Sequence, residues 1–202
     1  MDKLSLYEFL SFFLPGITAM YIVYQLIPGE YYFLKTTTNL LDGLMISIVA
    51  LIAGLLIHRI SFLWLRYKWY QWLVYPSVNA FVAKNREDLR LYYSKLKENV
   101  EHKNDTPGEL FDKAYYYLEC NDKINTAKMF QGMYFCLRNL VTLCLIMIPA
   151  ISISLIFYPR KIAVVFIIIL CISSIIISAI AHFYRGKMIV RIFANYYMAL
   201  KK

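Results

Sequence analysis

Charged residues are scarce in this chain. They make up 17% of its 202 residues, while hydrophobic residues make up 60%. An ordinary soluble domain has about 25% charged residues and about 45–50% apolar ones, so the composition excludes that class of protein. The balance is typical of a membrane protein.

Motifs for metal binding and catalysis are also missing. The four cysteines form no CxxC pair, which favours reduced thiols and no metal site. There is no glycine-rich nucleotide loop, no GxSxG and no HExxH. No arginine precedes His58, His102 or His182 at the spacing of one class of ribonuclease. We therefore expect no cofactor and no enzymatic activity.

Four apolar runs are present, at residues 6–27, 40–60, 134–157 and 162–184. Each can cross a hydrocarbon core of about 30 Å, which takes about 20 helical residues. The sequence predicts an all-α, polytopic membrane protein with four transmembrane helices and a helical cytoplasmic loop. The expected domains are a first transmembrane hairpin (1–63), the helical loop (64–133), a second transmembrane hairpin (134–184) and a basic cytoplasmic tail (185–202).

A cleaved signal peptide is the alternative for the first run. That run is longer than a typical signal core and contains Glu8, only Lys3 precedes it as a basic residue, and no small-residue cleavage site follows. These features favour a membrane helix.

The basic residues predict the orientation. With both termini in the cytoplasm, 19 of the 22 Lys and Arg residues lie inside, and only Lys35, Arg160 and Lys161 lie outside. The formal charge of +9 is then mainly cytoplasmic, which favours anionic lipid as a partner. Nucleic acid is the rival partner, because tyrosines are interleaved with the basic residues of the loop, but no nucleic-acid motif supports it.

Helices are also expected in the loop. The second membrane helix is expected to continue through Trp72 until Pro76 stops it, and a further helix is expected over 77–100. Thr106, Pro107 and Glu109 then form the pattern of a capping box with proline at the first helical position. That helix is expected to end near residue 121.

A polar stripe marks the fourth run, in the stretch CISSIIISAIAHFYRGK. At 3.6 residues per turn, Ser174, Ser178 and His182 share one face, which Cys171 and Arg185 continue. These three residues are pore-lining candidates. Packing of the stripe against another helix is the alternative.

Small residues recur on one face of the second run, at Gly43, Ser47, Ala50 and Gly54. This pattern lets two helix backbones approach closely, so we interpret it as a packing face.

Glu8 and Arg138 lie near the cytoplasmic ends of their runs. A charge within a membrane is normally paired or faces a cavity, so a Glu8–Arg138 pair is a hypothesis, and snorkelling of each side chain to the interface is the alternative.

Two segments, LYEFLSFFLPG (6–16) and GLLIHRIS (54–61), carry a family resemblance together with the basic loop and the closing hairpin. The chain resembles the small four-span membrane proteins of bacterial antiviral defence loci, such as the accessory membrane proteins of type VI CRISPR systems and the membrane effector of the Hailong system. The resemblance implies a bacterial inner-membrane protein that perturbs the membrane after infection and passes ions if it is a pore. It transfers no catalytic residue.

These observations predict an oligomeric gated pore, with a homo-oligomer as the assembly and an unknown cytoplasmic activator. Two alternatives stay open. One is a non-conducting structural or accessory membrane subunit that binds a cytoplasmic partner. The other is a transporter, although broken helices and inverted repeats are not evident.

Overall fold

The computed structural model describes residues 6–26, 40–83, 87–98, 102–157 and 161–201, and all regular structure in these ranges is helical. This confirms the all-α class. In chain order the helices are α1 (Leu6–Leu26), α2 (Leu40–Trp64), α3 (Lys68–Val74), α4 (Val78–Ala83), α5 (Glu87–Lys97), α6 (Pro107–Cys120), α7 (Asn125–Phe157) and α8 (Lys161–Leu200).

Three helices in the described ranges are long and apolar enough to cross a membrane, namely α2, α7 and α8. The apolar part of α1 is shorter, at Phe9–Val23. Together these helices indicate a multi-pass membrane protein. At 1.5 Å per residue, α7 is about 50 Å long and α8 about 60 Å, so both extend well beyond a hydrocarbon core of about 30 Å.

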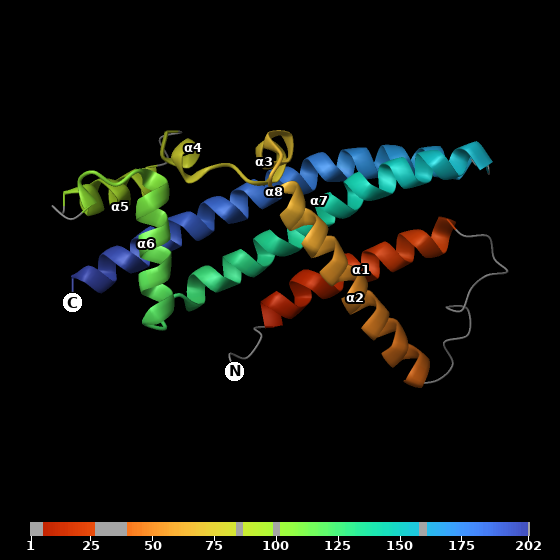
Figure 1. The fold of residues 1–202 in the computed structure, drawn as a ribbon, viewed down its shortest axis with the longest axis horizontal. Helices are drawn as coiled ribbons and strands as arrows, with labels where there is room; N and C mark the ends of the chain where they lie inside the picture. The colour runs from red at the N-terminus through yellow and green to blue at the C-terminus, as the bar shows by residue number, and fades with distance from the viewer. Residues whose placement is uncertain (1–5, 27–39, 84–86, 99–101, 158–160, 202) are drawn as a thin grey trace.

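The membrane helices form a bundle in which α7 and α8 run side by side along the longest axis of the molecule (Figure 1). Helix α1 packs against both α2 and α7. Apolar side chains from α1, α2, α7 and α8 meet in one cluster, which includes Ile22, Ile57, Leu143, Ile151 and Leu170. Many other apolar side chains on α2 and α8 point outward, as expected for helices that face lipid.

A second core lies at the other end of α8, where α5 and α6 pack on its last turns and α4 packs on α5 and α6. Helix α6 crosses α8 there (Figure 1). Leu96, Leu110 and Leu118 are buried against Ile189 and Phe193 of α8. We call α4, α5, α6 and the part of α8 from Met188 onward the loop domain. The segment expected as a basic tail is therefore helix, and it forms part of a core.

The predicted continuation of the second membrane helix through Trp72 is wrong. Helix α2 ends at Trp64, a turn follows, and Tyr67 has an extended backbone at the start of α3. The side chain of Gln71 donates a hydrogen bond of 2.6 Å to the carbonyl of Leu65, which stabilises this turn. The helix expected over 77–100 corresponds to α4, which ends at Ala83, and α5, which begins at Glu87, and the residues between them lie outside the described ranges.

The predicted capping box is confirmed. Thr106 accepts a hydrogen bond from the backbone N–H of Glu109, and the Glu109 carboxylate accepts one from the backbone N–H of Thr106. Pro107 is the first residue of α6, and the helix ends at Cys120, as expected.

Candidate functional site

A layer of polar side chains crosses the bundle at the end nearest the loop domain. Measured along each helix from the end farther from the loop domain (Leu40, Phe157 and Lys161), His58 lies about 27 Å along α2, Arg138 about 29 Å along α7 and Arg185 about 36 Å along α8. A hydrocarbon core is about 30 Å thick, so these residues lie near one face of a membrane. The polar layer consists of His58, Ser61, Tyr70, Tyr134, Arg138, Asn139, Thr142, Ser178, His182 and Arg185.

Arg138 is the largest of the fully buried side chains, with 1% of its surface exposed. Its Nη2 lies 3.3 Å from Nδ1 of His58, and its guanidinium carbon lies 4.8 Å from the ring centre of Phe135. Its Nε has no hydrogen-bond partner among the described residues. A buried donor without a partner is costly, so Arg138 is an unusual residue for a purely structural position.

Asn139 joins three helices beside Arg138. Its Nδ2 donates a hydrogen bond of 3.1 Å to the carbonyl of Ser11 on α1 and lies 3.2 Å from Nδ1 of His58 on α2. The ring of His58 also makes an edge contact with Phe12 at 4.8 Å. Because arginine can only donate, Nδ1 of His58 is the acceptor in its contact with Arg138.

The Glu8–Arg138 pair stays a prediction, because the Glu8 side chain lies outside the described residues. Among the side chains that the structure describes, no carboxylate forms an ion pair with Arg138. Glu8 precedes Ser11 by three residues on α1, and the carbonyl of Ser11 binds Asn139, the neighbour of Arg138.

A chain of three hydroxyl groups fixes α3 against α2 and α7. Tyr70 is fully buried, and its hydroxyl lies 2.9 Å from that of Ser61 and 2.6 Å from that of Thr142. The Thr142 hydroxyl donates its hydrogen bond to the carbonyl of Arg138. Tyr70 therefore donates to Thr142 and accepts from Ser61.

The carbonyl groups at the end of α3 accept hydrogen bonds from the polar stripe of α8. Ser178 donates to the carbonyl of Leu73, and Nε2 of His182 donates to the same oxygen at 2.7 Å. Nε of Arg185 donates to the carbonyl of Pro76 at 3.0 Å. The last carbonyls of a helix have no partner within it, and a cation near them is favourable.

Aromatic rings complete this contact. The Arg185 guanidinium carbon lies 3.5 Å from the ring centre of Tyr75, and Arg185 is only 3% exposed. Tyr134 of α7 donates a hydrogen bond of 3.0 Å to the carbonyl of Val74. Four side chains from α7 and α8 thus bind the end of α3.

The pore-lining candidates Ser178 and His182 are therefore both in contact with α3. Ser174 is buried, and its hydroxyl donates to the carbonyl of Cys171 in its own helix. It does not share the α3 contact of the other two residues.

The packing candidates of α2 separate into two pairs. Ala50 and Gly54 are buried where α1 crosses α2, and a Cβ built on Gly54 would lie 2.7 Å from the carbonyl carbon of Phe12. Gly16 of α1 is the counterpart, since its Cβ would lie 2.7 Å from the carbonyl carbon of Ala50. Gly43 and Ser47 are exposed, and no described atom lies within 4 Å of a Cβ built on Gly43.

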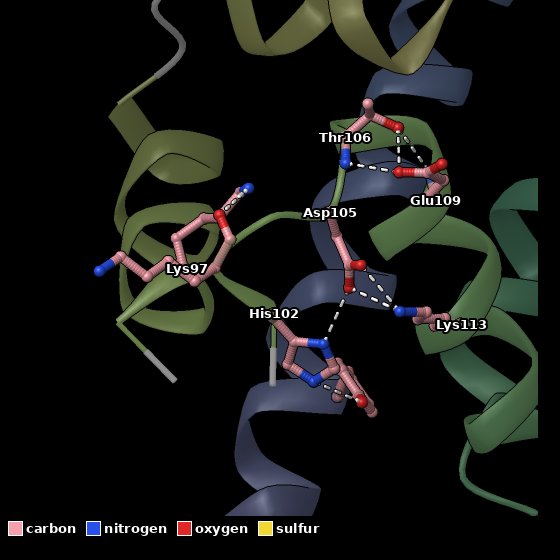
Figure 2. Close-up of polar contacts among 8 residues, drawn as sticks. Lys97, His102, Asp105, Thr106, Glu109 and Lys113 are labelled. Carbon is pink, nitrogen blue, oxygen red and sulfur yellow. Dashed lines mark hydrogen bonds and ion pairs between the residues drawn. The ribbon is translucent and has the colours of Figure 1, made fainter. Parts of the chain in front are cut away.

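A separate polar cluster joins the loop before α6 to the end of α8. Nδ1 of His102 lies 3.1 Å from the Asp105 carboxylate, and Nε2 lies 3.0 Å from the Tyr196 hydroxyl. Figure 2 shows His102 and Lys113 both directed at Asp105, and Lys113 lies 2.8 Å from it. The Lys113 hydrogen bond and then that of His102 lower the pKa of Asp105. No pattern in the sequence indicates this cluster, because 94 residues separate its histidine from its tyrosine.

No group of three or more His, Cys, Asp and Glu residues able to hold a metal ion occurs in the described parts of the chain. Comparisons with known protein families, with curated proteins and with solved structures give no match. The features that bear on function are therefore the polar layer, the loop domain and helix α8, which joins them.

Proposed function

We propose that the chain is a four-span membrane protein that makes the membrane permeable to ions as a homo-oligomer, after a cytoplasmic activator acts on the loop domain. In this proposal α1 crosses the membrane together with α2, α7 and α8, which makes four spans. Both termini lie in the cytoplasm. The membrane is a bacterial inner membrane, as in the defence proteins that the sequence resembles. The described structure is the closed arrangement. The observation that carries the proposal is the pair of hydrogen bonds from Ser178 and His182 to the carbonyl of Leu73.

These hydrogen bonds support a closed state because, through them, the backbone of α3 covers the polar face of α8. A donor that binds a carbonyl can exchange it for water at little net cost when the site becomes wet. The same face can therefore be covered by α3 in one state and line water in another. Helix α3 has only seven residues, so it can move as one unit, and its displacement breaks the hydroxyl chain of Tyr70 and the hydrogen bond from Tyr134 together with those from α8.

The structure also has a direct mechanical connection from the loop domain to this contact. Helix α8 runs without a break from the membrane to the loop domain, where Ile189, Ile192 and Phe193 are fully buried. The His102–Tyr196 hydrogen bond attaches the loop before α6 to the same helix. An activator that moves the loop domain would thus move the end of α8 that binds α3.

The second candidate function is a non-conducting accessory subunit that binds a cytoplasmic partner. The observation in its favour is that Ser178, His182 and Arg185 all have partners within a single chain, so that no water is needed beside them. Ion flux separates the two candidates.

The first experiment releases α3. The S178A/H182A variant leaves the Leu73 carbonyl without these two donors, and vesicles that contain it should leak ions faster than wild-type vesicles. Ser174→Ala is the matched control, because its hydroxyl binds only its own helix. Equal ion flux from S178A/H182A and S174A vesicles would contradict the pore and favour the accessory subunit.

The second experiment holds α3 in place, in a chain whose four cysteines are replaced by alanine. Leu73 and Ile177 pack on the same cluster of Tyr70, Val74 and Val141, so cysteines at these two positions should react with one short bifunctional thiol reagent. We expect the cross-link to suppress the leak of S178A/H182A and a cleavable reagent to restore it on reduction. A leak that persists in fully cross-linked protein, as quantified by mass spectrometry, would refute α3 as the closing element.

A further inference from the structure

A cleft lies between α5, α7 and α8, just beyond the polar layer. Its volume is about 450 Å³, and the two basic side chains in its wall are Lys187 and Arg191, both on α8. Tyr92 and Tyr184 add two hydroxyl groups. No carboxylate belongs to the described lining, which consists of Leu91, Tyr92, Phe130, Phe183, Tyr184, Lys187, Val190, Arg191 and Ala194.

The two basic residues are placed to bind one anionic group together. Lys187 and Arg191 are four residues apart on a helix, so their side chains are neighbours on one face. Among the described residues neither forms an ion pair, and the Lys187 amine lies 5.7 Å from the ring centre of Phe183. The cleft therefore has two available positive charges, with donors that suit a phosphate.

An apolar face leads along α8 to this cleft. Its residues recur every three or four positions, so they form one stripe along the helix. Each residue of the stripe has 40% to 54% of its surface exposed. The stripe consists of Ile169, Ile172, Ile176, Ile180 and Phe183. Phe183 belongs both to this stripe and to the wall of the cleft.

The depth of the cleft matches the headgroup region. Lys187 lies about 39 Å along α8 from Lys161, whereas a hydrocarbon core spans about 30 Å and a whole bilayer about 40–45 Å. The apolar stripe thus lies at the level of acyl chains and Lys187 at the level of phosphates, with Arg191 about one turn farther toward the loop domain.

We propose that this cleft is a binding site for the headgroup of an anionic phospholipid, with one acyl chain along the isoleucine stripe of α8. The combination of an apolar stripe with two unpaired cations at its inner end favours a lipid over a soluble phosphate compound. The inference requires that α8 crosses the membrane, and it does not depend on ion conduction.

Native mass spectrometry tests the site on the intact wild-type chain. Protein released from nanodiscs of equal phosphatidylglycerol and phosphatidylcholine should retain phosphatidylglycerol in preference, roughly tenfold or more for two basic residues near the headgroups. K187A/R191A should lose this preference. The control K103A/K123A removes the same charge from exposed positions outside the cleft and should keep it. Equal retention of the two lipids by the wild type, or equal loss in both variants, would overturn the assignment.

Thermal unfolding in detergent distinguishes the lipid from a soluble phosphate compound. At about 100 times the dissociation constant, phosphatidylglycerol should raise the unfolding midpoint of wild type by roughly 5 to 10 °C. Glycerophosphoglycerol, which has the same headgroup and no acyl chains, should raise it far less. An equal rise with both compounds would show a soluble phosphate site and refute the lipid. Loss of ion flux with lipid binding intact would contradict the proposed function alone.

Discussion

Replacing Gly54 by alanine should weaken the contact between α1 and α2. The added methyl carbon would lie 2.7 Å from the carbonyl carbon of Phe12, whereas two carbon atoms pack at about 3.5–4.0 Å. The atoms in its way belong to backbone, so no side chain can rotate to make room. The carbonyl oxygen of Phe12 lies closer still, so the two helices must separate by more than about 1 Å, or the crossing must shift.

The cost follows from two opposing terms. Overpacking of this kind destabilises by about 1–3 kcal/mol, and the rigid backbone favours the upper end. Alanine gains about 1 kcal/mol over glycine within a helix, which leaves a net loss of about 2 kcal/mol for Gly54→Ala. For a chain of this length that loss should lower the unfolding midpoint by roughly 4 to 8 °C.

Gly43→Ala is the matched control in the same helix. A Cβ at Gly43 meets no described atom within 4 Å, so only the helix-propensity gain remains and the midpoint should stay level or rise slightly. The assay is thermal unfolding in one detergent, followed by circular dichroism. Equal unfolding midpoints for the Gly54→Ala and Gly43→Ala variants would refute the close backbone contact between α1 and α2.

Three further changes test the polar contacts. Tyr70→Phe leaves the buried Ser61 hydroxyl without its acceptor, so the free energy of unfolding in detergent should fall by about 1–3 kcal/mol, and an unchanged value would contradict the hydroxyl chain. Asp105→Asn removes the charged acceptor of Lys113. Because the folded pKa of Asp105 lies below its ordinary value, its carboxylate stabilises the fold at neutral pH and this stability is lost as the pH falls through that lowered pKa. The unfolding midpoint of the variant should therefore fall less than that of wild type on acidification, and parallel pH profiles would contradict the pairing. Thr106→Ala removes the cap of α6 and should cost about 1 kcal/mol in chemical unfolding, where Thr106→Ser should cost little.

The sequence predicted what depends on local pattern. Long apolar runs gave the membrane helices, because a helix is the one open structure whose backbone groups are all satisfied in lipid. The start of α6 followed from Thr106, Pro107 and Glu109, since the residues of a capping box contact only one another.

The break after Trp64 could not be predicted in this way. The residues between α2 and α3 include neither glycine nor proline, so local propensity gives no reason for the helix to stop. The turn depends on the hydrogen bond from Gln71 to Leu65 and on the burial of Tyr70 against α2 and α7. The burial of Tyr70 is a tertiary contact, and it outweighs the tendency to continue the helix.

The polar stripe of α8 shows why a pattern of side chains leaves its partner open. Periodicity establishes that Ser178, His182 and Arg185 share a face, but a donor can bind a side chain, water or a backbone carbonyl equally well. Here the partners are carbonyls, which α3 leaves free because Pro76 cannot continue the helix. The proline and the stripe thus form one feature, in which α3 ends inside the bundle and α8 satisfies that end. A helix end held only by side chains of a neighbouring helix can be released by moving that neighbour, and the loop domain is built on the same helix.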